Sequence, residues 1–520
     1  MDPQPGVDPA SLQVLISRLS GVADEMGSVL RRAASSPNIK ERADCSAALF
    51  TPDGELLVQA EHIPVHLGSM PASVRAAIDS GVAVEAGVQI VLNDPFAGGT
   101  HLNDITLVAP CVADGRLVGW VANRAHHADV GGMVAGSIPP DAREIFQEGL
   151  RIPPVRMSPD LAQLIAANSR APIERAGDLA AQVGANAVGV ARLAAFAGEP
   201  LDQVLAYGER RMRAALAALP DGTWSATDVL DSTGPDPEQQ RPAVIRLRID
   251  KRGDRITFDF GGTDAQRPGN VNAVEAVTAS AVAFALRSVA DPTIPANAGA
   301  LRPVRIIVPV GSLLHARPPA AVGAGNVEVS QRVADVCLAA LAGTAPGRVG
   351  AAGQGTMNNL ILGGAGGWVY YETVGGGQGG RPQRAGMSGV HTAMTNTMDT
   401  PSEALERAYP LRVLRYRLRR DSGGAGRCAG GDGIERVIQV LEPAILSLIT
   451  ERRVTPPPGR AGGSPGAVGE NWRWPGGDEV RRVRLGDKVT VTLAAGDAVQ
   501  LLTPGGGGYG PSDARVPTSE

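Results

Sequence analysis

The chain contains 520 residues, of which 43% are hydrophobic and 20% are charged; this length supports a large buried core in two or three lobes and excludes a small disulfide- or metal-stapled fold. Its 49 basic and 53 acidic residues give a net charge of −4 at pH 7. So small an excess of charge exerts no long-range attraction on nucleic acid or anionic lipid, and neither is expected as a partner.

Cysteine usage and the N-terminal residues predict a cytoplasmic protein. Cys45, Cys111, Cys337 and Cys428 occur singly, without a CxxC pair, which is typical of reduced thiols rather than of a disulfide framework. Residues 1–10 show no basic segment followed by an apolar run, and no stretch of 18 or more apolar residues occurs. We therefore expect a soluble chain without a membrane segment.

The first predicted elements are a long helix and a β-hairpin. Apolar residues recur at helical spacing over 12–30, which indicates an amphipathic helix of about five turns. Two apolar runs, 45–50 and 55–60, flank the tetrapeptide TPDG at 51–54, whose Pro and Gly favour a tight turn. The two runs are therefore predicted to be antiparallel strands.

A second hairpin is predicted after a short helix and a Gly-rich loop. A helix that begins with proline is expected over 71–78, and a strand over 89–92 leads into the Gly-rich loop 93–104. The runs 105–112 and 116–125 have strand character and are joined by Ala-Asp-Gly. That connection is typical of a hairpin turn, so these strands should also pair.

The remaining chain alternates between helical and strand signals. Residues 158–219 are Ala-rich with helical spacing, and Pro-Asp-Gly ends this segment. The runs 244–249 and 255–260 alternate like strands, whereas 326–342 is predicted to be helical. Short strands and Gly-rich loops fill the C-terminal part.

These signals predict a multi-lobed α+β fold, that is, a mixed α/β chain with mostly antiparallel sheets and one Ala-rich helical segment. Hairpins dominate the N-terminal part and no regular βαβ alternation is present. We place an N-terminal lobe, which carries the helical segment, at 1–222. A Gly-rich C-terminal α/β lobe is placed at 223–520.

Histidines are concentrated in one part of the sequence. Five of the seven lie within residues 62–127, a window that is also rich in aspartate. If Asp114 and Gly115 form a two-residue turn, the numbers of facing residues in the second hairpin sum to about 229. This register places Asp104 opposite Ala125 and Asn103 opposite His126. The residues expected together at this end of the hairpin are His101, Asp104, His126 and His127.

The first hairpin supplies a further carboxylate to this group. With its centre between residues 52 and 53, the same arithmetic places Asp44 opposite Glu61 and beside His62. If the two hairpins are neighbours in one sheet, Asp44 joins the cluster. Two imidazoles and two carboxylates at strand ends match the ligands of a divalent transition metal that keeps an open position.

A metal site is favoured over the simpler alternative. An isolated histidine in a Gly-rich loop is more often a hydrogen-bonded turn residue, but here HxxD is followed by HHAD on the adjoining strand. Zn, Mn or Fe would lower the pKa of water and polarise a carbonyl or phosphoryl oxygen, which permits hydrolysis or enolate chemistry without a side-chain nucleophile. His127 and Asp129 are then the candidate catalytic acid–base residues.

Several motifs resemble the hydantoinase B/oxoprolinase family, and the resemblance extends over residues 10–511. In the N-terminal part the motifs are SPNIKERADCS at 36–46, HIPVHLGSM at 62–70, NDPFAGGTHLND at 93–104 and HHADVGG at 126–132. Further along they are PGNVNA at 268–273, GNVEVSQR at 325–332, ETVGGG at 372–377 and TPGGG at 503–507.

The resemblance implies one subunit of a two-subunit, ATP-dependent amidohydrolase that opens hydantoins, 5-oxoproline or lactams. In such systems an A-type partner with an actin-like ATPase fold binds ATP and phosphorylates the substrate, and the B-type subunit completes the reaction at a metal. The expected assembly is a hetero-oligomer, α2β2 or larger. By resemblance the metal ligands are Asp44, His101, Asp104 and His126. The candidate substrate-binding residues lie in the same motifs and are His62, Gly98, Gly99, Asn326 and Glu328.

Other functions remain as alternatives. A segment at 259–264, DFGGTD, resembles the phosphate loop of actin-like ATPases, but it lacks a second phosphate loop, and GxxxxGK[ST] is absent from the sequence. ATP binding is therefore assigned to the partner. A ketone carboxylase subunit of the acetone carboxylase type would use the same metal and partner, and a non-catalytic scaffold for a partner ATPase is the third hypothesis.

Overall fold

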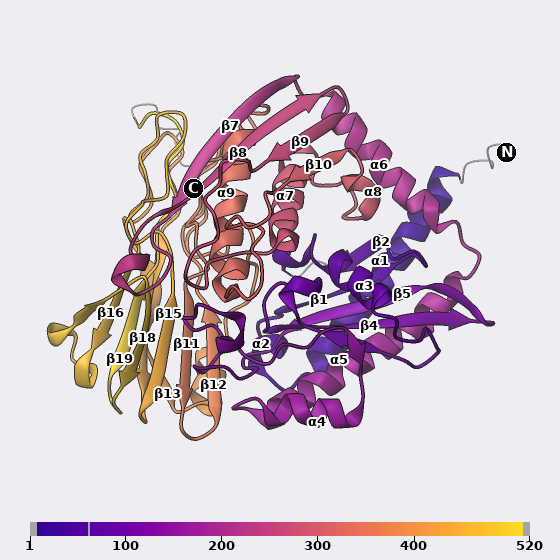
Figure 1. Ribbon diagram of the computed structural model, residues 1–520. Helices are drawn as coiled ribbons and strands as arrows, with labels where there is room; N and C mark the ends of the chain where they lie inside the picture. Colours follow the sequence, from indigo (N-terminus) through magenta and orange to yellow (C-terminus); the bar gives the residue numbers. More distant parts are fainter. Residues whose placement is uncertain (1–7, 61–62, 513–520) are drawn as a thin grey trace.

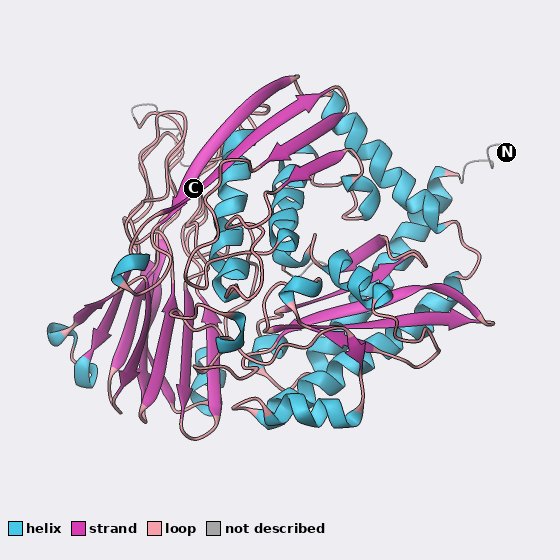
Figure 2. Cartoon of the chain, in the orientation of Figure 1, coloured by secondary structure: helices cyan, strands magenta, loops and turns pink. Residues whose placement is uncertain are grey.

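The structure, a computed structural model, describes residues 8–60 and 63–512 as four β-sheets with helices packed around and between them (Figures 1 and 2). Among the paired strands of this part of the chain, only β9 (Arg255–Asp259) and β10 (Val304–Ile307) run parallel. The predicted mixed α/β fold with mostly antiparallel sheets is confirmed. The predicted division at residue 222 stays a prediction.

The N-terminal sheet has six strands in the order β2-β1-β5-β4-β3-β6. They are β1 (Cys45–Phe50), β2 (Leu56–Ala60), β3 (Ile90–Leu92), β4 (Asp104–Ala113), β5 (Arg116–His126) and β6 (Val155–Arg156). Both predicted hairpins form, and β1 pairs with β5, so the two hairpins are neighbours in one sheet. This adjacency satisfies the condition under which Asp44 was expected near the second hairpin.

The two faces of this sheet are covered by different helices. In β1, Ala47 and Leu49 belong to the cluster that includes α1 (Pro9–Ala33), whereas Ala48 and Phe50 pack with α3 (Met70–Asp79). This follows from the period of two along a strand. Helix α1 begins where the Asp8 side chain accepts a hydrogen bond from the Ser11 amide, which is a normal N-cap.

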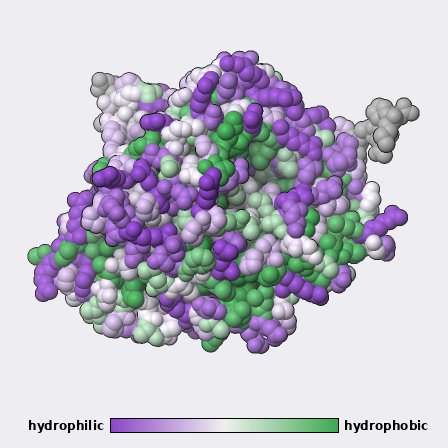
Figure 3. Space-filling model, in the orientation of Figure 1, coloured by the Kyte–Doolittle hydropathy of each residue, from purple (hydrophilic) through white to green (hydrophobic). Residues whose placement is uncertain are grey.

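The Ala-rich segment forms three helices separated by short breaks. They are α4 (Pro159–Ala167), α5 (Pro172–Leu193) and α6 (Leu201–Ala217). Residues 172–196 are long and apolar enough to span a membrane by length and composition, although 44% of the apolar 18-residue window within them is buried inside the protein. Helix α5 packs on β4, β5 and α1. The exposed Leu164 and Ile173 lie on α4 and α5, and Figure 3 shows hydrophobic surface around this region.

The middle sheet has the order β10-β9-β8-β7 and is covered by helices on the side that faces the protein interior. Its other strands are β7 (Gly222–Leu230) and β8 (Ala243–Arg252). The associated helices are α7 (Glu275–Ala290), α8 (Ala298–Leu301), the π-helical turn η6 (Gly325–Val329) and α9 (Ser330–Leu341). Helix α9 packs on α7 and on both β7 and β8, and α6 packs on α8.

Two sheets form the C-terminal part, and Figure 1 shows their strands side by side. The four-stranded sheet contains β11 (Asn359–Gly364), β12 (Trp368–Thr373), β15 (Ala444–Ile449) and β18 (Lys488–Leu493). The five-stranded sheet contains β13 (Leu411–Arg419), β14 (Gly433–Val440), β16 (Glu470–Trp474), β17 (Val483–Leu485) and β19 (Ala498–Leu502). Leu360 and Leu446 of the first sheet share a hydrophobic cluster with Ile438 and Leu501 of the second.

Short helical elements complete the described chain. The α-helical ones are α2 (Pro37–Lys40) and α10 (Ser402–Ala408). The 3-10 turns are η1 (Pro64–His66), η2 (Pro95–Ala97), η3 (Ile145–Gln147), η4 (Ala194–Phe196), η5 (Pro237–Gln239), η7 (Pro475–Gly477) and η8 (Glu479–Arg481).

Candidate metal centre

His101, Asp104 and His126 lie together at the end of the β4–β5 hairpin. All three are buried, and one ligand atom from each lies within 4.8 Å of the other two. Asp104 Oδ1 is 3.1 Å from His101 Nε2 and 3.2 Å from His126 Nδ1. The two imidazole nitrogens are 3.2 Å apart. Three of the four predicted ligands are therefore close enough to share one cation.

A β-bulge sets the alignment of this group. The predicted register is wrong by one residue, because Asp104 faces His126, whereas the prediction placed Asn103 there. The register changes between Cys111 and Val112, where β5 contributes one residue more than β4. Such an extra residue shifts every pair beyond it. The bulge thus places the carboxylate of Asp104 directly opposite an imidazole.

The protonation of His101 leaves a lone pair directed at its neighbours. His101 Nδ1 is 3.2 Å from the Gly323 carbonyl oxygen, which can only accept, so this nitrogen carries the proton of the neutral ring. Nε2 then faces Asp104 and His126 as an acceptor. Burial acts to lower the pKa of His101, but the Asp104 carboxylate, the Gly323 carbonyl and Asp44 outweigh it. The net pKa is therefore raised, which favours the doubly protonated ring over the neutral one more than in a free histidine.

The second oxygen of Asp104 is held by separate donors. Thr100 Oγ1 donates to Asp104 Oδ2 at 2.6 Å and Asn326 Nδ2 donates at 3.1 Å. His66 Nε2 is 3.6 Å from the same oxygen. Although burial acts against the ionised form, the imidazoles of His101, His126 and His66 hold the pKa of Asp104 well below its ordinary value. The carboxylate is therefore ionised and its Oδ1 faces the two imidazoles.

Two of these neighbours bear on the sequence predictions. Asn326, predicted to bind substrate, lies beside this group as a donor to Asp104, and its Oδ1 has no partner among the described residues. Substrate binding by Asn326 stays a prediction. His66 was not selected from the sequence, although it belongs to the histidine-rich window; its Nδ1 is 2.9 Å from Ser46 Oγ. The only sequence signal for His66 was its place among the clustered histidines. That clustering does not show which of these histidines lie beside Asp104.

Tyr371 is a neighbour that the sequence did not indicate. Its ring stacks on His126, with ring centroids 4.6 Å apart and an angle of 19° between the planes. Tyr371 lies on β12 in the C-terminal part of the chain, and its hydroxyl donates to Asn359 Oδ1 at 2.9 Å. No local motif links it to the histidine window, so only the tertiary fold could reveal this contact.

Asp44 lies beside the group without joining it. Its carbonyl oxygen accepts the His126 amide at 3.0 Å, but its carboxylate is not among the three ligand atoms within 4.8 Å of one another. The predicted first-hairpin register is also wrong, because Ala47 faces Ala60, two residues from the expected alignment. Glu61 and His62 lie outside the described residues. A ligand role for Asp44 stays a prediction.

His127, a predicted acid–base residue, contacts α5. Its Nε2 is 2.9 Å from Gln182 Oε1. The Gln182 amide group donates to the Ile105 carbonyl and to Asn123 Oδ1, so its oxygen accepts from His127. Burial lowers the pKa of His127 to about 4, which keeps the ring neutral near pH 7. The acid–base role stays a prediction, although this geometry does not favour it.

Asp129, the other predicted acid–base residue, organises the loop that follows β5. Oδ1 accepts from the amides of Gly131 and Arg170, and Oδ2 accepts from the Gly136 amide and the Arg170 guanidinium. These four contacts occupy both oxygens. They indicate a structural role, and a catalytic role for Asp129 stays a prediction.

Gly98 and Gly99, predicted to bind substrate, have a packing reason to be glycine. Gly98 has φ +92°, and a Cβ there would lie 2.4 Å from the Ala72 carbonyl oxygen. A Cβ on Gly99 would lie 2.6 Å from the Asn93 carbonyl oxygen. The approach at Gly98 holds the loop against α3, and that at Gly99 packs the loop on itself. Substrate binding by these glycines stays a prediction.

Glu328, also predicted to bind substrate, lies in a buried polar group. Its Oε1 accepts from Thr356 Oγ1, the Met357 amide and Asn359 Nδ2. Its Oε2 has no hydrogen-bond partner among the described residues. Burial and the nearby Glu451 carboxylate raise the pKa of Glu328 to about 8. The side chain is thus neutral near pH 7.

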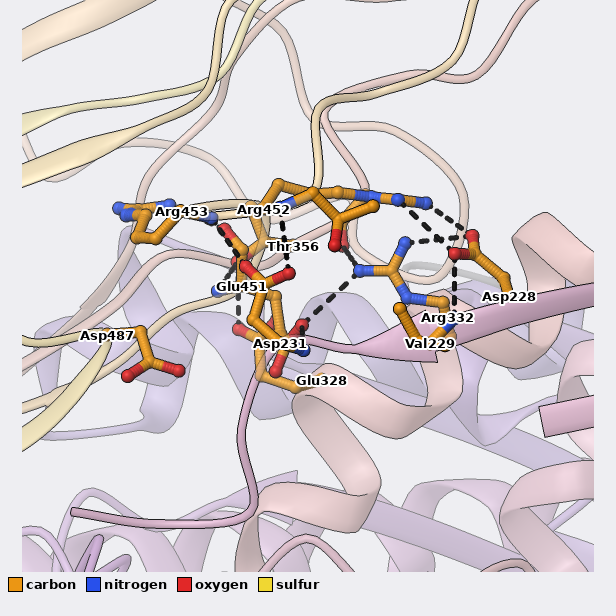
Figure 4. Close-up of polar contacts among 12 residues, drawn as sticks. Asp228, Val229, Asp231, Glu328, Arg332, Thr356, Glu451, Arg452, Arg453 and Asp487 are labelled. Atoms are coloured by element: carbon orange, nitrogen blue, oxygen red, sulfur yellow. Dashed lines mark hydrogen bonds and ion pairs between the residues drawn. The ribbon is translucent and has the colours of Figure 1, made fainter. Parts of the chain in front are cut away.

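This polar group continues into an ion-pair network, which we call the intersheet network (Figure 4). Its charged members are Asp228, Arg332, Asp335, Glu451, Arg452, Asp487 and Lys488. Asp228 Oδ2 is 3.1 Å from the Arg332 guanidinium and 2.6 Å from that of Arg452. A cavity of about 460 Å³ opens beside Asp228 and Arg452, but His101, Asp104 and His126 do not line it.

Comparison with known proteins gives a consistent result over nearly the whole chain. The family model described as hydantoinase B/oxoprolinase matches residues 8–512. The B-type chain of a putative D-/L-hydantoinase from Pseudomonas sp. is 31% identical, over 98% of this chain and 91% of that protein. The 5-oxoprolinase 1 of Arabidopsis thaliana is 39% identical over 97% of this chain, but the match covers only 42% of the plant protein.

Solved structures share the fold. The ATP-dependent caprolactamase from Pseudomonas jessenii superimposes with a TM-score of 0.91 at 29% identity, over 98% of this chain and 93% of that one. A nucleotide-free acetone carboxylase gives a TM-score of 0.88 at 18% identity, over 98% of this chain and 76% of that one. The second likeness shows the fold alone.

Proposed function

This chain belongs to the hydantoinase B/oxoprolinase family, and from that premise we propose that it is the metal-bearing B-type subunit of an ATP-dependent hydrolase that opens cyclic amides or ureides. The buried group of His101, Asp104 and His126 is the observation that carries this proposal. Hydantoin, N-methylhydantoin, 5-oxoproline and lactams are the candidate rings.

The donor set fits a divalent transition metal. Two imidazole nitrogens and one carboxylate oxygen converge in a buried site, which is the ligand chemistry that Zn, Mn and Fe accept. His101, Asp104 and His126 would hold the ion, with Asp44 as the proposed fourth ligand. The ion would act as a Lewis acid toward a carbonyl or phosphoryl oxygen and lower the pKa of water.

The residues around the centre prepare it for this role. Thr100 and Asn326 hold one oxygen of Asp104, so that the other remains directed at the imidazoles. The Tyr371 ring stacks on one face of His126 and so restricts the rotation of that imidazole. A ligand whose orientation is fixed before the ion arrives loses less conformational entropy on binding.

The proposed reaction requires a partner. Because GxxxxGK[ST] is absent from the sequence, we assign ATP to an A-type ATPase subunit in a hetero-oligomer, α2β2 or larger. The partner would transfer a phosphoryl group to the amide oxygen, which makes the ring carbon a better electrophile. Summed over lactam opening and ATP hydrolysis, two waters are consumed, and the products are an open-chain amino acid, ADP and phosphate.

The cysteines bear on the location of the protein. All four are buried and free, which agrees with a reducing compartment. We therefore propose a cytoplasmic protein, and fractionation of the source cells would test this.

Metal content and ring opening test the function together. The purified wild-type chain should contain one transition metal ion per molecule and should open a cyclic amide in the presence of its partner and ATP. Asp104→Asn removes the central negative charge and should abolish both. Asp53→Asn, in an exposed turn, is the matched control. A metal-free wild-type chain, or Asp104→Asn with full turnover, would contradict the proposal.

The same assay separates the alternatives. Ketone-dependent ATP turnover that requires bicarbonate would indicate a carboxylase subunit instead of a hydrolase. If variants of all four proposed ligands retain turnover while assembly with the partner fails in other variants, the chain acts as a scaffold.

A further inference from the structure

Glu148 is a buried carboxylate that is bound by main-chain amides. It follows η3 and is 1% exposed. Its Oε1 accepts the Gly323 amide at 2.7 Å, and its Oε2 accepts the Val322 amide at 3.1 Å. Among the described residues, no ion pair involves Glu148. Burying a carboxylate without a cation costs free energy. Packing alone therefore does not explain why a glutamate occupies position 148.

The segment that Glu148 binds also contacts the metal centre. The carbonyl oxygen of Gly323 accepts from His101 Nδ1 at 3.2 Å. One peptide segment is therefore bound by a carboxylate through its amides and by an imidazole through its carbonyl. The orientation of that carbonyl decides which nitrogen of His101 carries the proton, and hence which nitrogen is left as a ligand.

The space around Gly323 shows how tightly this segment is held. A Cβ on Gly323 would lie 2.9 Å from Glu148 Oε1 and 3.0 Å from the Ile138 side chain. The segment cannot move toward either neighbour without contact. Burial raises the pKa of Glu148 to about 7, which agrees with a carboxyl group enclosed by the fold.

We propose that Glu148 is a positioning residue of the metal centre: it holds residues 322–323 so that the Gly323 carbonyl binds His101 Nδ1–H and leaves His101 Nε2 free to ligate. This inference rests on the proposed metal site. Glu148 does not touch the ion or the substrate, and its effect passes through the main chain of Gly323.

Glu148→Gln tests this role with the full-length chain freed of metal. A carboxamide offers one acceptor oxygen, so one of the two amides loses its partner and faces an NH₂ group. The dissociation constant for Zn²⁺, measured by competition with a chelator, should rise about 10–100-fold, the usual effect of removing an outer partner of a metal ligand. The visible absorption spectrum of the Co²⁺-loaded protein should also change, because His101 is no longer held in one orientation.

Further variants separate positioning from general loss of stability. Glu148→Asp keeps two acceptor oxygens on a shorter side chain and should bind Zn²⁺ with intermediate affinity. Glu85→Gln, at an exposed site, should leave the dissociation constant and the Co²⁺ spectrum unchanged. If Glu148→Gln does not fold, Gly323→Ala provides a second test. The added methyl group would disturb the contact between Glu148 and the Gly323 segment without changing charge, and it should weaken Zn²⁺ binding in the same way.

The outcomes distinguish this inference from the proposed function. If the wild-type chain binds neither Zn²⁺ nor Co²⁺, the metal site fails and the role of Glu148 fails with it. If the wild type binds both ions and a folded Glu148→Gln or Gly323→Ala protein binds them with equal affinity and spectrum, the metal site stands and this inference is overturned.

Discussion

Asp104 shows how one residue can combine several constraints. One of its oxygens is shared between two imidazoles, and the other is held by Thr100 and Asn326. Three of these four partners come from the same hairpin or its adjoining loop, whereas Asn326 comes from η6. The Asp104 carboxylate therefore connects the β4–β5 hairpin to η6, whose Asn326 lies 222 residues further along the chain than Asp104.

The histidine at position 391 provides a prediction about pH. Burial lowers its pKa to about 4, with the Arg42 charge acting in the same direction and Asp399 against it. Its ring nitrogens contact Thr395 and Thr397. Since the unfolded value is near 6.5, the unfolded chain binds more protons between pH 6.5 and 4, and stability falls as pH decreases through this window.

We therefore expect His391→Gln to reduce the loss of stability between pH 7 and pH 5 by about 2 kcal/mol. Thermal unfolding of both proteins at several pH values measures this difference. His315→Gln, at a partly buried site, is the matched control. Parallel curves for wild type and His391→Gln would contradict the prediction.

Among the elements, the β4–β5 hairpin and helix α5 determine the candidate site together. The bulge in β5 changes the register by one residue, and a one-residue change of register alters which side chains face each other. Gln182 and Asn186 of α5 then hydrogen-bond the β4 main chain, so the helix is fixed by polar contacts as well as by apolar packing. This polar contact identifies α5 as part of the protein core.

Gln182→Leu should destabilise the protein by about 2–4 kcal/mol, because it leaves the Ile105 carbonyl, Asn123 Oδ1 and His127 Nε2 without their buried partner. Denaturant titration of the metal-free chain measures the change. The effect should appear as a lower denaturation midpoint.

Gln163→Leu, on the exposed side of α4, provides the same change of side chain without buried partners. It should alter the midpoint only slightly. Equal midpoints for the two variants would show that the hydrogen bonds of Gln182 do not stabilise the docking of α5.

At the level of the whole molecule, buried cations join parts of the chain that lie far apart in sequence. Arg42, next to β1, donates to the Tyr371 carbonyl at 2.5 Å and to Thr373 Oγ1 at 2.7 Å, both on β12. In the intersheet network, Arg332 of α9 and Arg452 after β15 share Asp228 of β7. These contacts orient the middle and C-terminal sheets around the candidate metal centre.

Asp228→Asn should destabilise the molecule by about 3–5 kcal/mol, because Arg332 and Arg452 are both fully buried and lose a shared counter-charge. The substitution keeps the shape of the side chain, so the effect is electrostatic. Differential scanning calorimetry measures it as a lower unfolding temperature.

Asp250→Asn, on β8 of the same sheet, removes one side of a partly exposed pair with Arg252 at 3.2 Å. Such a pair contributes only about 0–1 kcal/mol. If Asp228→Asn unfolds at the same temperature as Asp250→Asn, the intersheet network does not hold the sheets together.

Local patterns predicted a large part of the fold. The helical spacing over 12–30 corresponds to α1, and the signals at 45–60 and 105–125 correspond to two hairpins of one sheet. These patterns are reliable because they reflect the burial of one face of a single element. The exact register was not predictable, because a bulge is decided by the packing of both strands and has no sequence signal here.

The amino-acid sequence alone determined the elements, the family and the concentration of histidine and aspartate at the end of one hairpin. It did so because helices, hairpins and motifs depend on residues that are neighbours along the chain. Only the tertiary structure decided that Asp104 faces His126, that Tyr371 and Asn326 adjoin them, and that Glu148 holds the Gly323 segment beside His101. These contacts join residues 22–245 positions apart, and such proximity is set by the packing of the whole molecule.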